Sequence, residues 1–82
     1  MRIVKEIPLG NFKATIFSWN GKYLIKFESG SYEQTYKISE MDLLAGDEDI
    51  VKLLSDQEFM GIVNERFNAM KKDFAAAIGK VM

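Results

Sequence analysis

The chain has 82 residues, 48% of them hydrophobic, and a formal net charge of −1, which predicts a single globular domain over residues 1–82. It has no cysteine and no histidine, which excludes disulfides, thiolate chemistry and the commonest general base and metal ligand. The nearly balanced charge argues against strong non-specific binding of nucleic acid.

Up to about residue 39, hydrophobic and polar residues alternate with the period of two that is typical of strands. Asn20-Gly21 lies between two such runs, and this dipeptide is the strongest short-range signal of a hairpin. A two-residue loop there places Phe17 opposite Leu24. Gly10-Asn11 predicts an earlier turn of the same kind, and it pairs Val4 with Phe17.

The third predicted turn, around Ser29-Gly30-Ser31, leaves the loop length open. A loop of two or four residues places Tyr36 on the same face as Ile25, whereas a loop of three residues places it on the opposite face. We prefer an even loop, because it aligns the aromatic residues of the last strand with the core. Pro8 cannot donate a hydrogen bond to a neighbouring strand, so the first strand is expected at an edge.

These registers give the sheet two different faces. The core face is almost wholly apolar and must be covered; it is predicted to hold Ile3, Ile7, Leu9, Phe12, Ala14, Ile16, Tyr23, Ile25, Phe27, Tyr32, Gln34, Tyr36 and Ile38. Lys5 is the one charged residue that the regular register places there. The outer face mixes lysines and glutamates with an apolar group, which is predicted to comprise Val4, Phe17, Trp19 and Leu24.

From about residue 40 the hydrophobic residues recur every three or four positions, which is typical of helices. Ser39 and the acidic residues after it predict a short helical connector over 40–54. The pattern Ser55-x-x-Glu58 resembles a capping box, with Ser55 as the cap, directly before a long apolar stripe. We therefore expect a long C-terminal helix from about 56 to 80.

The predicted long helix outruns the predicted sheet. A helix of 25 residues is ~38 Å long, whereas four strands make a sheet only ~15–20 Å wide. The apolar stripe nevertheless continues to the helix end, through Phe74, Ala77, Ile78 and Val81. We expect a second copy of the chain to cover these residues in a homodimer. The alternative is that this end packs on the 40–54 segment or frays.

No arrangement of residues in the sequence is typical of an enzyme. The glycines stand singly, so there is no phosphate-binding loop, and the serines have no histidine partner. Asp47-Glu48-Asp49 lacks the ligand spacing of a calcium loop and is typical of a helix start. Glu28 and Glu33 could form a carboxylate pair, but they could equally be ion-pair partners of lysines. We therefore expect no catalytic, cofactor-binding or metal-binding residues.

Two binding functions fit the outer face. In the first, this face and the helix end bind protein, and the candidate interface is Val4, Phe17, Trp19, Leu24, Phe74, Ala77, Ile78 and Val81. In the alternative, the outer face binds single-stranded nucleic acid weakly, because aromatic rings stack on bases and lysines contact phosphates. The residues for that alternative are Lys13, Phe17, Trp19, Lys22, Lys26 and Lys37.

The order of four strands and a helix resembles the unit of the Pur-alpha and whirly families, which bind single-stranded nucleic acid. The resemblance rests on the turns Gly10-Asn11, Asn20-Gly21 and Ser29-Gly30 and on the stripe from Met60 to Val81. It implies a topology and assigns no residue a role, because the lysine-rich loop of the whirly proteins has no match here. As a whole, the chain is more similar to a small bacterial protein family.

Together these observations predict an α+β fold. A four-stranded antiparallel meander, over about 2–9, 12–19, 22–29 and 32–38, packs on the long C-terminal helix. The expected function is that of a small, dimeric, non-enzymatic binding or adaptor domain without a cofactor, whose partner is a protein. The start, Arg2 to Glu6, is too charged for a secretory signal, and no apolar run is long enough to span a membrane. We therefore expect the cytoplasm.

Overall fold

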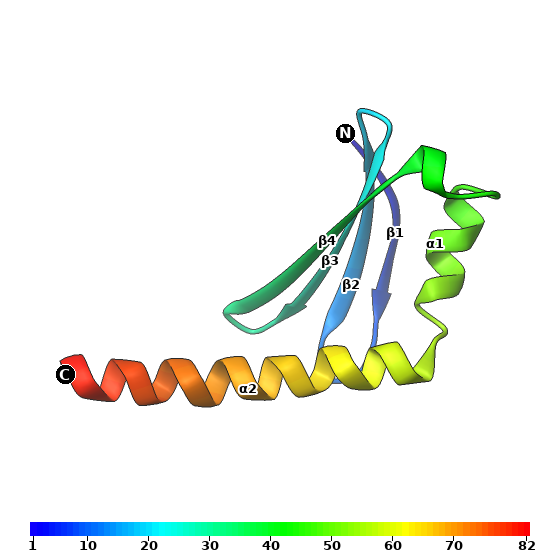
Figure 1. The fold of residues 1–82 in the computed structure, drawn as a ribbon. Helices are drawn as coiled ribbons and strands as arrows, with labels where there is room; N and C mark the ends of the chain where they lie inside the picture. Colours follow the sequence, from blue (N-terminus) through cyan, green and yellow to red (C-terminus); the bar gives the residue numbers. More distant parts are fainter.

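The computed structural model describes residues 1–82 and has an α+β fold, with four antiparallel strands in one open sheet and a long C-terminal helix (Figure 1). The strands are neighbours in chain order: β1 (Arg2–Pro8), β2 (Lys13–Trp19), β3 (Lys22–Ser29) and β4 (Tyr32–Ser39). A 3-10 turn (Glu40–Asp42), a short helix α1 (Asp47–Leu53) and a long helix α2 (Gln57–Val81) follow. The predicted fold class is confirmed.

All three predicted hairpin turns are present. Asn20 and Gly21 have φ values of 54° and 72°, and positive values at both positions suit the twist of a two-residue hairpin loop. At the first turn, the backbone N–H of Leu9 donates to the carbonyl oxygen of Phe12 at 2.8 Å. At the third turn, Ser29 lies opposite Tyr32, so the loop has two residues and the preferred even register is confirmed.

Strand β1 departs from the predicted register at a β-bulge between Ile3 and Lys5. The predicted pairing of Val4 with Phe17 is wrong, because Ile3 lies opposite Phe17 and Val4 packs against the core. A bulge places one extra residue against the partner strand, so the residues before it change faces. Ile3, predicted on the core face, is therefore on the outer face and is 60% exposed. Lys5 stays exposed although it lies opposite the buried Ile16.

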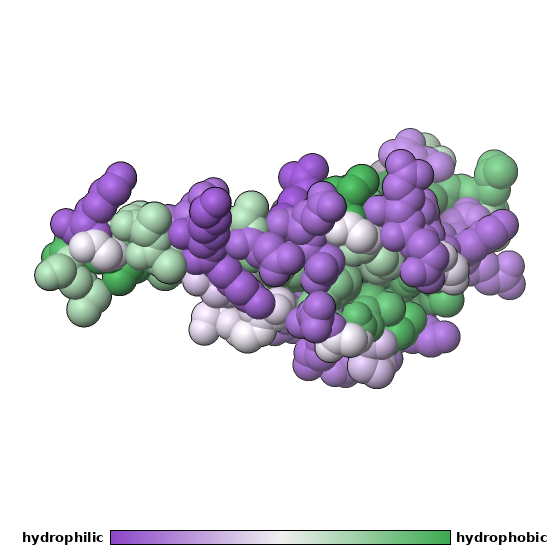
Figure 2. All heavy atoms as spheres, turned by 90° about the horizontal axis from the view of Figure 1, so that it is seen from below, coloured by the Kyte–Doolittle hydropathy of each residue, from purple (hydrophilic) through white to green (hydrophobic).

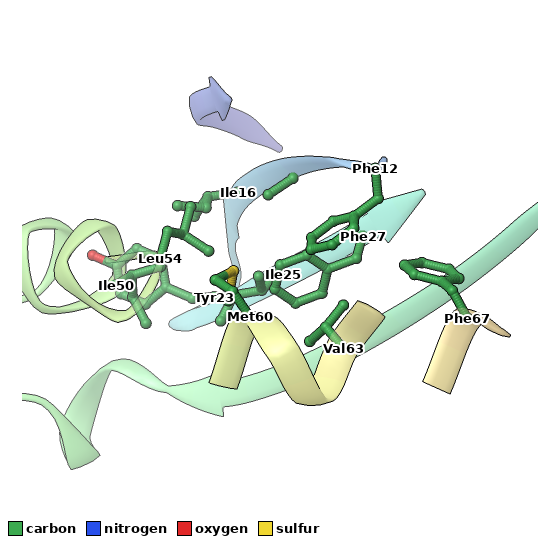
Figure 3. Packing of buried hydrophobic residues seen from close by; sticks show 11 residues of the cluster. Phe12, Ile16, Tyr23, Ile25, Phe27, Ile50, Leu54, Met60, Val63 and Phe67 are labelled. Carbon is green, nitrogen blue, oxygen red and sulfur yellow. The ribbon is translucent and has the colours of Figure 1, made fainter. Parts of the chain in front are cut away.

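The hydrophobic core lies between the sheet, α1 and α2 (Figure 3). Its largest fully buried side chains include Phe27 from β3 and Phe67 from α2. Phe12 joins them: its ring centroid is 5.8 Å from that of Phe27 and 5.6 Å from that of Phe67. The other buried hydrophobic residues are Ala14, Ile16, Tyr23, Ile25, Ile50, Leu54, Met60 and Val63. The predicted apolar positions of β2, β3 and α2 thus form one core.

Helix α2 begins one residue later than the capping box predicts. Asp56, not Ser55, is the N-cap, and its carboxylate accepts hydrogen bonds from the backbone N–H groups of Glu58 and Phe59 at 3.0 and 3.1 Å. The side-chain amide of Gln34 on β4 donates to the carbonyl oxygen of Val63 at 3.0 Å. These bonds hold the first half of α2 in place against the sheet.

The second half of α2 projects beyond the sheet, on the side of β4 (Figure 1). Every residue from Lys71 to Met82 is exposed, and we call this segment the overhang. It forms a separate arm when the molecule is seen from below (Figure 2). The overhang makes the protein elongated, with extents of 47 × 26 × 19 Å. The predicted overrun of the helix is confirmed.

Candidate interaction surfaces

The overhang carries an apolar stripe that nothing in a single copy covers. Phe74 is 55% exposed, Ile78 38% and Val81 79%, and Ala77 is exposed as well. Phe74 makes one aromatic contact, edge-to-face with Tyr32 at a centroid distance of 6.2 Å. The alternative in which this end packs on the 40–54 segment is wrong, because α1 lies at the opposite end of α2 (Figure 1).

The outer face of the sheet carries a second uncovered apolar group. Ile3, Phe17 and Leu24 lie opposite one another on three adjacent strands and form a row across the sheet. Trp19 lies two residues beyond Phe17 on β2 and is 47% exposed. The structure therefore brings together three of the four predicted residues, Phe17, Trp19 and Leu24. Sequence reasoning missed Ile3, because the bulge that brings it there has no clear signature in the sequence.

The lysines of the outer face are partly neutralised. Lys13 Nζ lies 3.1 Å from Glu6 Oε1, and Lys26 Nζ lies 3.7 Å from Glu33 Oε2. The hydrogen bond with Glu6 and the charges of Glu6 and Glu28 raise the pKa of Lys13 above its ordinary value. Lys22 and Lys37 make no ion pair. The outer face thus carries charges of both signs and is not a continuous basic surface.

A polar cluster fastens α1 to the sheet. Arg2 lies on the core face because of the bulge, and both of its terminal nitrogens approach the carboxylate of Asp47 at 3.4 Å. The hydroxyl of Tyr23 donates a hydrogen bond to the same carboxylate. Asp47 is the first residue of α1, where the helix dipole also favours a negative charge. Two hydrogen-bond donors and the helix end thus stabilise the ionised form of this carboxylate.

This cluster shifts two ionisation equilibria in opposite directions. The hydrogen bond from Tyr23, followed by the one from Arg2, holds the pKa of Asp47 below its ordinary value of 3.8. The hydrogen bond to Asp47, together with burial, raises the pKa of Tyr23 from 10.0 to about 12. The contribution of Tyr23 to stability is therefore complete below pH 10.0 and is lost as the pH rises to about 12. The contribution of Asp47 is lost as the pH falls below 3.8.

We expect the phenol of Tyr23 to titrate about two pH units above an ordinary tyrosine. The ultraviolet absorbance of phenolate, measured in the wild type and in Tyr23→Phe, gives the titration of Tyr23 by difference. Asp47→Asn is the matched variant, and it should move the midpoint down toward 10.0, because it weakens the hydrogen bond that Tyr23 donates and removes the charge that opposes the phenolate. A wild-type midpoint near 10.0 would contradict the hydrogen bond.

A hollow of about 610 Å³ lies between β4, α1 and the start of α2. Tyr36, Leu53, Phe59 and Ile62 contribute to its apolar walls. Its charged lining residues are Lys37, Asp49, Asp56 and Glu58. We call it the α1 hollow. Sequence reasoning did not predict it, because its walls come from several elements whose relative placement is a tertiary property.

Two of the three carboxylates of the α1 hollow, Asp49 and Asp56, have structural roles. Asp49 accepts hydrogen bonds from the backbone N–H groups of Leu44 and Ala45 at 3.0 and 2.8 Å, and Asp56 caps α2. No three acidic side chains come close enough together anywhere in the molecule to hold a metal ion. None of the helices is both long and apolar enough to cross a membrane.

Comparison with protein-family models, with curated proteins and with solved structures finds no match to this chain. The likeness to the Pur-alpha and whirly units therefore stays one of element order, and it assigns no residue a role.

Proposed function

We propose that the protein is a small, non-enzymatic, homodimeric binding domain, an adaptor of the cytoplasm whose partner is another protein. The observation that carries the proposal is the overhang, a stretch of α2 with an apolar stripe and no cover in one copy. Leaving an apolar helix face in water is unfavourable, and most of the stability of helices in proteins comes from packing such a face on another surface. A second copy supplies that cover, and two-fold dimers are the commonest soluble assemblies.

The outer face supports a protein as the further partner. Its row of Ile3, Phe17 and Leu24, with the half-exposed Trp19 beside it, is an apolar centre within a charged rim. Protein interfaces have this anatomy, and tryptophan is enriched among the residues that contribute most to binding. The ion pairs of Lys13 and Lys26 weaken this face as a phosphate-binding surface.

One observation favours nucleic acid as the second candidate. Lys22 lies directly opposite the half-exposed Trp19 and makes no ion pair, so a base could stack on the ring while the ammonium group contacts a phosphate. The two candidates differ in their dependence on salt. Affinity for nucleic acid falls steeply as the salt concentration rises, whereas an apolar protein contact is much less sensitive.

Light scattering at micromolar concentration tests the dimer. We expect a mass near twice the 9.4 kDa of one chain. Phe74→Glu should weaken the dimer by about 100-fold or more, because a two-fold interface buries the new charge twice. Lys72→Glu is the matched control: it lies on the opposite side of the helix and should leave the dimer intact. A wild-type monomer with unchanged helical content would contradict the proposal.

The fluorescence of Trp19, the only tryptophan, then separates the two partner classes. An emission shift on addition of a single-stranded oligonucleotide, reversed by salt, would favour nucleic acid over protein. We expect no such shift, since the outer face carries charges of both signs.

A further inference from the structure

A trough runs along α2 on the side of β4. The α1 hollow shares Tyr36 with a second hollow of about 420 Å³ between β4 and the middle of α2. The second hollow shares Met70 and Asp73 with a third of about 560 Å³, which reaches Phe74 and Ala77. The trough therefore follows α2 from α1 to the beginning of the overhang.

Strand β4 borders this trough and is an unprotected sheet edge. The opposite edge, β1, is interrupted by its bulge and by Pro8, two features that prevent further strand pairing. Strand β4 has eight residues, no proline and a regular register. Native proteins cover such edges with a helix or a loop, among other devices. A helix lying in the trough would shield this edge.

The α1 hollow and the end of the overhang carry opposite charges. Asp49, Asp56 and Glu58 line the α1 hollow against Lys37 alone. Lys80 is the one charged residue among residues 74–81 of the overhang. Attraction between opposite charges favours the pairing of these two surfaces and selects its orientation. A helix that enters with its basic end at the α1 hollow runs antiparallel to α2.

We propose that, in the homodimer, each α2 lies antiparallel in the trough of the other copy. Residues 74–81 of one copy then fill the apolar α1 hollow of the other, against Leu53, Phe59 and Ile62. The trough and the overhang both lie along α2. In a dimer with one two-fold axis, each copy therefore covers the overhang of the other and fills its α1 hollow. The inference rests on the proposed dimer. It adds where the overhang binds on the other copy and in which direction the partner helix runs.

Crosslinking tests this arrangement directly, because the chain has no cysteine of its own. Single substitutions Glu58→Cys and Lys80→Cys are made on separate chains, both at exposed positions. The chains are mixed and treated with a short bis-maleimide. In the antiparallel arrangement the mixed pair should crosslink about tenfold faster than a control pair, because neighbours in one complex react at a high effective concentration. The control pairs Lys80→Cys with Glu48→Cys, an exposed acidic position outside the α1 hollow.

The outcomes separate this inference from the proposed function. Preferential crosslinking of Glu58→Cys with Lys80→Cys, in a sample that light scattering shows to be dimeric, supports both. A dimer in which Lys80→Cys crosslinks mainly with itself has the two overhang ends side by side, away from the α1 hollows, and overturns the inference alone. A dimer in which Glu48→Cys crosslinks with Lys80→Cys as fast as Glu58→Cys does also overturns the inference alone. A monomer by light scattering overturns the dimer and this inference together.

Discussion

Phe27→Ala should lower the free energy of unfolding by about 3–5 kcal/mol, enough to unfold much of a domain this small. Phe27 is fully buried in the middle of β3. Its ring packs edge-to-face with those of Phe12, Tyr36 and Phe59, which come from three other parts of the chain. The truncation therefore leaves a cavity where the sheet and α2 meet. Urea denaturation followed by circular dichroism, at a fixed protein concentration, measures the loss.

Phe17→Ala is the matched control for Phe27→Ala. Phe17 is the same residue type on the neighbouring strand, but it lies on the outer face and is partly exposed. Removing the ring of Phe17 should lower the free energy of unfolding by about 1 kcal/mol, as is usual away from a fully packed core. Equal losses at the two positions would show that the two faces of the sheet have been assigned wrongly.

Phe67→Ala is the second change with a large expected effect, also about 3–5 kcal/mol, and it should detach α2 from the sheet. Only Met60, Val63 and Phe67 of this helix are buried. Phe67 is the last of the three before the overhang, and its ring lies against that of Phe12 at 5.6 Å. Without the ring of Phe67, the helix loses the buried contact nearest to the overhang. Helical content should therefore fall together with stability.

Far-ultraviolet circular dichroism in the absence of denaturant checks the helical part of this prediction. Asn68→Ala, at the adjacent exposed position, is the control and should be neutral or slightly stabilising, because alanine is the better helix former. If Phe67→Ala kept the full helical signal and the stability of the control, α2 would not depend on the sheet for its position.

Much of the fold follows from local signals in the sequence. The period of two and the dipeptide Asn20-Gly21 determine the β2–β3 register, because a two-residue loop leaves one way to pair the strands. The preference for an even loop after Ser29 is confirmed, since only that loop turns Tyr36 toward the apolar side. The overhang follows from length alone: the rise per residue makes α2 longer than the sheet is wide.

The tertiary structure decided the features that depend on competition between distant groups. The bulge in β1 leaves Lys5 opposite Ile16, where the regular register also places it, and Lys5 stays exposed on this edge strand. The bulge changes the residues before Lys5: Val4 packs against the core, Ile3 turns outward, and Arg2 reaches Asp47. The α1 hollow likewise exists only because α1 and α2 meet β4 at particular positions. Hairpin registers and helix length depend on residues that are near in sequence. The face on which a residue of β1 lies, and the hollows between elements, depend on which distant elements pack together.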